Sequence, residues 1–212
     1  MFPLFLNVES RVSLVVGGGP VGRRKAKGIL QAGGQVRLVC LEPRPADEPS
    51  EQLQWFHEPY RPDHLDGVAL AFAAATSEVN RRVAVDARQR GIWVNVADDP
   101  DVSDFFLPAV HRRGSLLIAV GTKGAAPTLA QQVRDLLKNQ FDNRLGDAFE
   151  RWLAALGEVR PLILENVSDP NLRRELFHRL SNSDWLDRFL HEDAAVVQAA
   201  MMAEVRQKLQ ES

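Results

Sequence analysis

Three glycines near the start of the chain have the spacing that a nucleotide-binding turn requires. Gly17, Gly19 and Gly22 fill the pattern G-x-G-x-x-G between an apolar run and an amphipathic run. In that context the first glycine permits a tight turn, the second lets a pyrophosphate approach the backbone, and the third lets a helix pack closely on a strand. The helix N-terminus that follows favours phosphate. The pattern predicts a dinucleotide site, with a purely structural glycine turn as the alternative.

The carboxylate of Glu42 stands at the end of the second predicted strand. In dinucleotide folds an acidic side chain roughly 20 residues past the third glycine accepts hydrogen bonds from the adenosine ribose. A carboxylate there repels a 2′-phosphate, which favours NAD over NADP. Arg44 lies close by and can pair with that phosphate, so NADP stays open. A solvated loop position is the alternative for Glu42.

A third chemical group is expected at the carboxyl ends of the strands, where open α/β sheets bind their ligands. Three segments are predicted at this edge: the glycine turn, 75–77 and 95–99. A carboxylate that follows a strand beside a cofactor can act as a general base, and Asp98 is the best placed. Asp99 precedes Pro100 and is expected to shape the turn, which is also the alternative for Asp98.

The remaining charged and polar side chains do not indicate a specific functional site. Four basic residues of the first helix form a solvated face or attract an anionic ligand: Arg23, Arg24, Lys25 and Lys27. The histidines do not cluster, and we expect them in loops or on helix surfaces without a catalytic role: His57, His64, His111, His178 and His191. The single cysteine, Cys40, is expected as a buried thiol in a strand. No Cys/His zinc pattern is present, so we predict no metal site.

The composition is that of a soluble globular protein, with 212 residues, 45% hydrophobic and 25% charged. A formal net charge of −2 provides no basic field for nucleic acid. No apolar run approaches the roughly 20 residues that span a membrane. The apolar start of the chain lacks a basic n-region, so we do not expect a signal peptide. We expect a cytoplasmic protein with neither nucleic acid nor membrane as a partner.

The elements that must position these groups alternate between strand and helix. Strands are predicted at 11–16, 36–41, 53–56, 68–75 and 92–96, helices at 20–32 and 80–90, and a loop at 43–49. This alternation implies right-handed βαβ units and a parallel sheet. After Pro108 we predict a strand at 115–120 and a helix at 128–139, and beyond Phe141 only helices, including one from Asp169-Pro170, 183–190 and 194–209.

The predicted fold class is therefore α/β. A Rossmann-like parallel sheet occupies 1–110 as an NAD-binding domain. A small strand–helix segment follows at 111–145, and a C-terminal α-helical domain at 146–212.

Several segments together resemble the precorrin-2 dehydrogenase/sirohydrochlorin ferrochelatase family, the N-terminal module of siroheme synthases. The matching segments are Phe2–Asn7, Val15–Val21 with Arg24–Ala26, Val79–Val83, Gly91–Pro100, Asp104–Ala109 and Pro127–Ala130. Their order and spacing match within residues 1–138. The Asn-Val-x-Asp segment followed by Phe-x-x-Pro-Ala is much more specific than the glycine motif.

The resemblance implies NAD-dependent oxidation of the tetrapyrrole precorrin-2 to sirohydrochlorin by a homodimer built through the segment after Pro108. It leaves open a second activity, insertion of ferrous iron as a substrate into sirohydrochlorin. Asp98 falls on the family's proposed catalytic aspartate. Predicted cofactor contacts are Gly17, Gly19, Pro20, Val21, Leu41, Glu42 and Thr76. Predicted substrate contacts are Thr122 and Lys123.

The chain departs from the family pattern at three places. Gly121–Gly124 replaces a Ser-x-Gly-Gly run, the loop at Thr76–Glu78 is shorter and lacks an Asp pair, and Gln131 stands where members often have arginine.

Five basic residues either bind substrate carboxylates or lie on an ordinary surface: Arg112, Arg113, Lys123, Arg134 and Lys138. The alternative functions are an NAD-binding regulatory module without catalysis and an unrelated NAD oxidoreductase. The sequence leaves a siroheme or a cobalamin branch open for the product.

Overall fold

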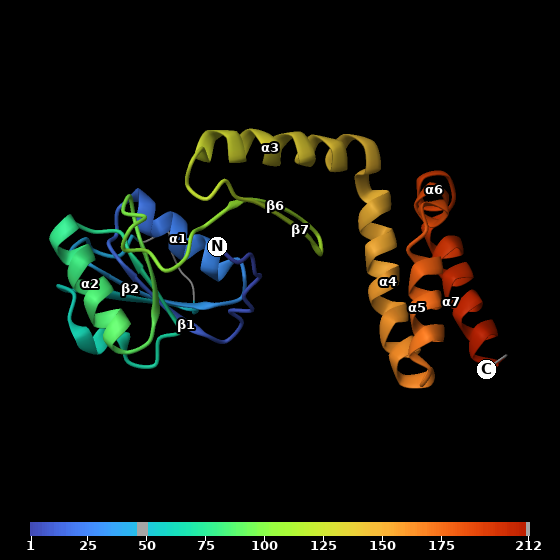
Figure 1. The fold of residues 1–212 in the computed structure, drawn as a ribbon, viewed down its shortest axis with the longest axis horizontal. Coiled ribbons are helices and arrows are strands. Elements are labelled where there is room, and N and C mark those ends of the chain that lie inside the picture. The colour runs from blue at the N-terminus through green and yellow to red at the C-terminus, as the bar shows by residue number, and fades with distance from the viewer. Residues whose placement is uncertain (46–50, 211–212) are drawn as a thin grey trace. The chain divides into compact units, whose positions relative to one another are not determined.

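The structure is a computed structural model that describes residues 1–45 and 51–210, without the side chains of 143 and 144. Its internal contacts divide the chain into two units, Met1–Leu107 and Pro108–Ser212, which we call unit 1 and unit 2 (Figure 1). We describe each unit by itself. The predicted further division at residue 145 stays a prediction.

Unit 1 is built on a five-stranded sheet. Its elements are β1 (Val12–Val16), α1 (Pro20–Leu30), β2 (Gln35–Cys40), β3 (Leu53–His57), the 3-10 helix η1 (Pro62–Leu65), β4 (Leu70–Ala73), α2 (Ser77–Gln89) and β5 (Trp93–Val96). The strand order is β3-β2-β1-β4-β5, and every neighbouring pair is parallel. This is the order of the dinucleotide-binding fold, with the crevice where the order reverses between β1 and β4. The predicted α/β, Rossmann-like class is confirmed.

The central strand β1 is apolar because both faces of the sheet are covered. Leu14 and Val16 pack in a cluster with Val83 of α2. Val15 points to the opposite face and packs with Ala26 of α1. Since successive strand residues alternate between faces, a strand between two helical layers needs a continuous apolar run. The glycine turn therefore starts from a strand whose last four residues are buried.

The predicted elements of unit 1 differ from the observed ones mainly at their ends. Helix α2 begins at Ser77, and not at residue 80, because the Thr76 side chain accepts a hydrogen bond from the backbone N–H of Val79 (3.4 Å). The Asn80 side chain also accepts a hydrogen bond from the N–H of Ala75 (2.8 Å). Two capping contacts therefore start the helix earlier than the apolar spacing indicated.

Two further differences concern the links between elements. Helix α1 ends at Leu30 instead of residue 32, because the chain turns through Gly33 with a φ of +78°. The 3-10 helix η1 was not predicted. Residues 46–49 of the predicted loop lie outside the described residues.

Unit 2 begins with a hairpin and continues with helices. Its elements are β6 (Ala109–Arg113), β7 (Leu116–Val120), α3 (Pro127–Gln140), the π-helical segment η2 (Phe141–Leu145), α4 (Gly146–Asn166), α5 (Pro170–Leu180), α6 (Ser183–His191) and α7 (Ala194–Gln210). The strands β6 and β7 are antiparallel, and α3 packs on β6. Figure 1 shows α4, α5 and α7 side by side, in agreement with their contacts. The prediction missed β6 because its sequence, Ala-Val-His-Arg-Arg, is mostly polar.

Helices α4 to α7 share one apolar core. Ile163 of α4, Leu176 of α5, Phe189 of α6 and Met201 of α7 are each at most 2% exposed and belong to a single cluster. Complete burial of a side chain of this size stabilises a fold by about 1.5–3 kcal/mol. The prediction that only helices follow Phe141 is confirmed for the residues that the structure describes.

Candidate functional site

The glycine turn joins β1 to α1 at the carboxyl edge of the sheet. Gly17 has a φ of +114°, and a Cβ there would clash with the carbonyl oxygen of Ala74 beyond β4. A Cβ on Gly22 would clash with the carbonyl oxygen of Gly17, so the helix packs directly on the turn. A Cβ on Gly19 would face open space. The outer glycines are required by backbone geometry, and the middle one leaves room for a phosphate.

The N-terminus of α1 has the features of an anion site. Pro20 occupies the first turn, no side chain caps the helix, and its first turn contains no acidic residue. The Arg23 side chain donates a hydrogen bond to the carbonyl of Gly18 (2.7 Å), and its guanidinium lies 5.6 Å from the centre of the Trp55 ring. Free N–H groups and a basic residue that ties the turn to its own helix suit a pyrophosphate.

Glu42 lies beside the same turn, beyond the end of β2. Its Oε2 and the Sγ of Cys40 would each come within 2.8 Å of a Cβ on Gly18. The carbonyl of Glu42 accepts hydrogen bonds from Trp55 Nε1 (3.0 Å) and from the Cys40 thiol (3.3 Å). Burial raises the pKa of that thiol, which keeps it a donor. The neighbouring Leu41 is 70% exposed. The predicted ribose acceptor is thus fixed next to the glycine turn.

The three segments predicted at the carboxyl edge do meet there. Backbone hydrogen bonds continue beyond the strand ends, from Gly17 N–H to Val39 (2.9 Å), from Ala74 N–H to Val16 (2.8 Å) and from Ala97 N–H to Ala73 (2.8 Å). The residues that follow these positions therefore start from one aligned edge. Thr76 and Asp98 both lie within two residues of it along the chain.

Asp98 occupies a conformation that few residues adopt. Its φ is +59°, in the left-handed region, where aspartate is more frequent than most residues. The loop is fixed by Ser103, whose hydroxyl accepts a hydrogen bond from Val96 N–H (2.9 Å) and donates one to the carbonyl of Asp99 (2.8 Å). The Asp98 side chain is exposed, and within the described parts of the chain no cation lies within ion-pair distance of it. Its carboxylate is free to meet a ligand.

Lys25 reaches the same edge, although the sequence did not single it out. Its Nζ donates a hydrogen bond of 2.5 Å to Oδ1 of Asn95 in β5 and lies 5.6 Å from the centre of the Phe72 ring. Asn95 is 7% exposed. Of the four basic residues in α1, Arg24 and Lys27 are exposed, while Arg23 and Lys25 are partly buried. The solvated-face alternative is therefore wrong for two of the four.

Helical spacing along the sequence could have identified Lys25 as a residue that faces the sheet. It lies three residues after the buried Gly22 and four before the buried Ile29, on the side of α1 that faces the sheet. Burial lowers the pKa of the Lys25 ammonium, and the charge of Arg24 lowers it further. The charge of Asp98 acts in the opposite direction. The two groups therefore interact electrostatically across the edge.

A family match covers this whole arrangement. Residues 4–109 match the family described as putative NAD(P)-binding. The chain belongs to this family. The glycine turn, Glu42 and Asp98 all lie within the match. The open space at Gly19 and the uncapped N-terminus of α1 fit the dinucleotide that the family binds.

The NAD(P)-binding chain is also similar to siroheme synthases over most of its own length. It is 36% identical over 206 residues to the siroheme synthase of Chromobacterium violaceum, which covers 94% of this chain and 43% of that protein. It is 35% identical over 186 residues to the siroheme synthase of Nitrosomonas eutropha. This match covers 84% of this chain and 38% of that protein. The chain thus spans less than half the length of these curated relatives. The resemblance to siroheme synthases expected from the sequence is confirmed.

A solved structure agrees with the fold. SirC, a precorrin-2 dehydrogenase, superimposes with a TM-score of 0.69 over 100% of both chains at 23% identity. At this identity the likeness establishes the fold of both units and no more.

The predicted substrate contacts lie in unit 2 of this NAD(P)-binding chain. Thr122 uses its hydroxyl to accept a hydrogen bond from the N–H of Ala126 (3.1 Å), just before α3. Lys123 is exposed, with a φ of +55°. The hydroxyl of Thr122 thus has a structural partner, and the contact of both residues with substrate stays a prediction.

The basic residues around the hairpin are not equivalent. Arg113 forms ion pairs with Asp142 (2.8 Å), Asp147 (2.9 Å) and Glu150 (2.9 Å). The hydrogen bond from Arg113 holds the pKa of the Asp142 carboxyl below its usual value. Arg134 lies 2.7 Å from an oxygen of its neighbour, Asp135. For Arg113 these contacts favour the structural alternative over a substrate role.

The predicted placement of the histidines was wrong for three of them. His57 lies in β3, and His64 and His111 are buried. His64 Nδ1 accepts a hydrogen bond from the N–H of Arg61 (3.0 Å), so its Nε2 carries the proton and donates to Glu58 (2.9 Å). This contact lowers the pKa of Glu58. A histidine with both nitrogens engaged stabilises the fold, which is why its burial costs little.

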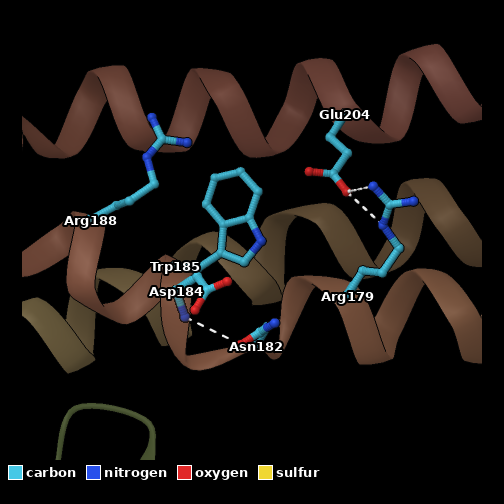
Figure 2. Close-up of a pocket in the computed structure, with 6 residues that line it drawn as sticks. All are labelled: Arg179, Asn182, Asp184, Trp185, Arg188 and Glu204. Carbon is cyan, nitrogen blue, oxygen red and sulfur yellow. Dashed lines mark hydrogen bonds and ion pairs between the residues drawn. The ribbon is translucent and has the colours of Figure 1, made fainter.

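A pocket in unit 2 is lined by Arg179, Asn182, Asp184, Trp185, Arg188 and Glu204 (Figure 2). Arg179 and Glu204 pair at 2.8 Å, and the Asn182 side chain accepts a hydrogen bond from the N–H of Asp184 (3.3 Å). The Arg188 guanidinium lies 5.0 Å from the centre of the Trp185 ring. Arg188 pairs with Glu192, which is outside the lining, and no predicted site residue lines this pocket.

Two features are absent from the described residues. Within 1–45 and 51–210, no group of three or more His, Cys, Asp or Glu side chains is placed to hold a metal ion. None of the helices described in these ranges has the length and apolar character to span a membrane.

Proposed function

We propose that this chain oxidises precorrin-2 to sirohydrochlorin with NAD as the hydride acceptor. The observation that supports this most directly is the position of Asp98, on a fixed loop at the same sheet edge as the glycine turn. The 36% identity to a siroheme synthase over 94% of the chain supports the tetrapyrrole as substrate.

Each residue at the edge has a distinct task in this reaction. The glycine turn and the N-terminus of α1 bind the pyrophosphate, and Glu42 accepts hydrogen bonds from the ribose. When bound there, NAD would supply the hydride acceptor for precorrin-2. Asp98 accepts the proton that leaves with the hydride and then releases that proton to water. One hydride and one proton are lost, so the products are sirohydrochlorin, NADH and a proton.

The position of Glu42 supports NAD over NADP. Its carboxylate lies against Gly18, at the turn that meets the pyrophosphate. A 2′-phosphate on the ribose would bring a second negative charge to this carboxylate. We therefore expect kcat/KM for NAD to exceed that for NADP in the same assay.

The proposal includes a cytoplasmic homodimer whose tetrapyrrole substrate meets Thr122 and Lys123. On α3 the side chains of Leu129, Leu136 and Leu137 are 52%, 67% and 37% exposed. Apolar side chains grouped on one helix are typical of an interface, and a second copy of the chain would cover them. Light scattering after size-exclusion chromatography should give the mass of a dimer, and a monomer would contradict this part.

The decisive experiment is oxidation of precorrin-2 under anaerobic conditions with NAD, followed by the visible spectrum of sirohydrochlorin. In Asp98→Ala we expect kcat to fall by about 10²–10⁴-fold, the usual contribution of a general base. The NAD dissociation constant should stay unchanged. Asp101→Ala, an exposed residue of the same loop, is the matched control and should retain full activity.

The outcomes separate the two candidate functions. NAD binding without turnover in the wild-type protein would support the regulatory module and overturn the enzymatic proposal. Full activity in Asp98→Ala would remove that residue from the mechanism. Ferrous iron insertion stays a prediction of the family resemblance, and addition of ferrous ion to sirohydrochlorin tests it separately.

A further inference from the structure

We propose that Lys25 is a positioning residue for Asp98. Its ammonium, held by Asn95, anchors the start of the loop that bears the base and keeps a positive charge beside that loop. This inference rests on the proposed function, because it assigns Lys25 a part in the same reaction.

The first support is the path of the Lys25 side chain. It starts from α1 and passes the Phe72 ring of β4, with Nζ 5.6 Å from the ring centre. It ends 2.5 Å from Oδ1 of Asn95, in β5. Asn95 precedes Asp98 by three residues, and β5 ends between them at Val96. The ammonium therefore lies at the base of the loop that bears Asp98.

The second support is the fixed orientation of Asn95. Its Nδ2 donates a hydrogen bond to the carbonyl of Phe105 (2.8 Å), so its Oδ1 must face Lys25. The Phe105 ring packs edge-on against Phe72, with ring centres 5.4 Å apart. One amide thus links the helix that bears the cation to the far end of the loop that bears the base. A shift of the ammonium would disturb that loop.

The third support is the charge itself. An ammonium has three N–H donors, and Asn95 accepts one of them. In the parts of the chain that the structure describes, no carboxylate lies within ion-pair distance of Lys25. Removal of an ammonium from water is costly without such a partner. A methionine would fill the space against Phe72 without that cost, so packing alone does not explain a cation here.

The charged groups that act on the ammonium come from two elements. Arg24, on the same helix, opposes the positive charge, while Asp98, on the loop after β5, favours it. Precorrin-2 is rich in carboxylates, and the Lys25 ammonium offsets part of their negative charge beside this loop.

The test uses two substitutions that separate charge from contact. Lys25→Gln can keep a hydrogen bond to Asn95 but loses the charge, whereas Lys25→Arg keeps the charge. We expect the acid limb of kcat against pH to move up by roughly 1 pH unit in Lys25→Gln. The NAD dissociation constant should not change. Lys25→Arg should restore most of the wild-type profile. Lys27→Gln, on the exposed side of the same helix, is the control and should match the wild type.

A second measurement needs no turnover. Because Asp98 acts to raise the pKa of Lys25, Asp98→Ala should lower that pKa in the ligand-free protein, as followed by NMR at the Lys25 Cε. An unchanged Lys25 titration, or a Lys25→Gln profile equal to that of the wild type, would overturn the inference. If the titration responds but the wild type does not oxidise precorrin-2, the proposed function fails while the coupling of the two groups stands.

Discussion

Units 1 and 2 use their charged side chains in different ways. In unit 2, Arg113 lies within 3 Å of three carboxylates, and Arg179 is paired with Glu204 at 2.8 Å. At the carboxyl edge of unit 1, Lys25 faces the neutral amide of Asn95 instead. Pairs of opposite charge stabilise the fold and leave little for a ligand. Charges that are held in place but not neutralised are those that can act on a ligand.

The edge of unit 1 also contains unusual backbone conformations. The edge of unit 1 combines Gly17 at a φ of +114° with Asp98 at a φ of +59°. Such conformations cost free energy and persist where the surroundings enforce them, which is common at functional sites. The helices of unit 2 are held by an apolar core around Ile163 and Met201. We therefore expect the chemistry at the edge of unit 1, while the apolar core of unit 2 stabilises the fold.

The largest expected effect tests the core of unit 2. Ile163→Ala removes a side chain that is 0% exposed and should lower the free energy of unfolding by about 2–5 kcal/mol. Leu164→Ala, next to it but 40% exposed, is the matched control and should cost much less. Urea denaturation followed by circular dichroism measures both. NAD affinity should be unchanged, and a weaker affinity in Ile163→Ala would break the division between the units.

A smaller effect tests the glycine turn of unit 1. Gly22→Ala places a Cβ against the carbonyl oxygen of Gly17, which should cost about 1–3 kcal/mol of stability. NAD binding should weaken at least tenfold, since the turn must move. Gly28→Ala, on the same helix but in open space, should stabilise it by up to about 1 kcal/mol. Calorimetric titration with NAD measures the affinity of each variant. Equal NAD affinity in Gly22→Ala and Gly28→Ala would contradict the expected displacement of the turn by the clash.

The smallest effect tests whether the ion pairs of unit 2 act on stability alone. The hydrogen bond from Arg113 lowers the pKa of Asp142 in the folded protein. The ionised Asp142 therefore stabilises the fold above the ordinary aspartate pKa of 3.8, and this stabilisation is lost as the pH falls below 3.8. Asp142→Asn should therefore reduce Tm by at most about 2 °C at pH 7.

Measurement of Tm at several pH values makes this prediction more specific. The Tm difference between Asp142→Asn and the wild type should shrink as the pH falls below 3.8. Asp147→Asn, which removes a more exposed partner of Arg113, should have a smaller effect. Oxidation of precorrin-2 should be unaffected in both variants. A loss of activity in Asp142→Asn would give unit 2 a direct part in the chemistry.

Several parts of the site could be predicted because each depends on neighbours along the chain. The glycine spacing, the strand before it and the carboxylates of Glu42 and Asp98 are local patterns, and the parallel sheet brings their strand ends to one edge. Lys25 was not predicted because its partner, Asn95, is 70 residues away along the chain. A contact of that kind depends on how α1 crosses β4.

The same physical limit explains the errors at β6 and His64. The polar sequence of β6 did not predict a strand, and in the folded chain three carboxylates of η2 and α4 pair with its Arg113. His64 looked exposed until the Arg61 backbone and Glu58 satisfied its two nitrogens. Polar residues predict exposure only when their partners are water, and a folded chain can supply those partners itself.

Apolar periodicity and glycine spacing were enough to predict the strand–helix alternation of unit 1 and its glycine turn, because these depend on steric and hydrophobic preferences of adjacent residues. The tertiary structure alone decided which charges are neutralised and which remain available at the sheet edge. Electrostatic interactions act between groups that are close in space, whatever their separation along the chain, and burial strengthens them. The linear order of residues does not contain those distances.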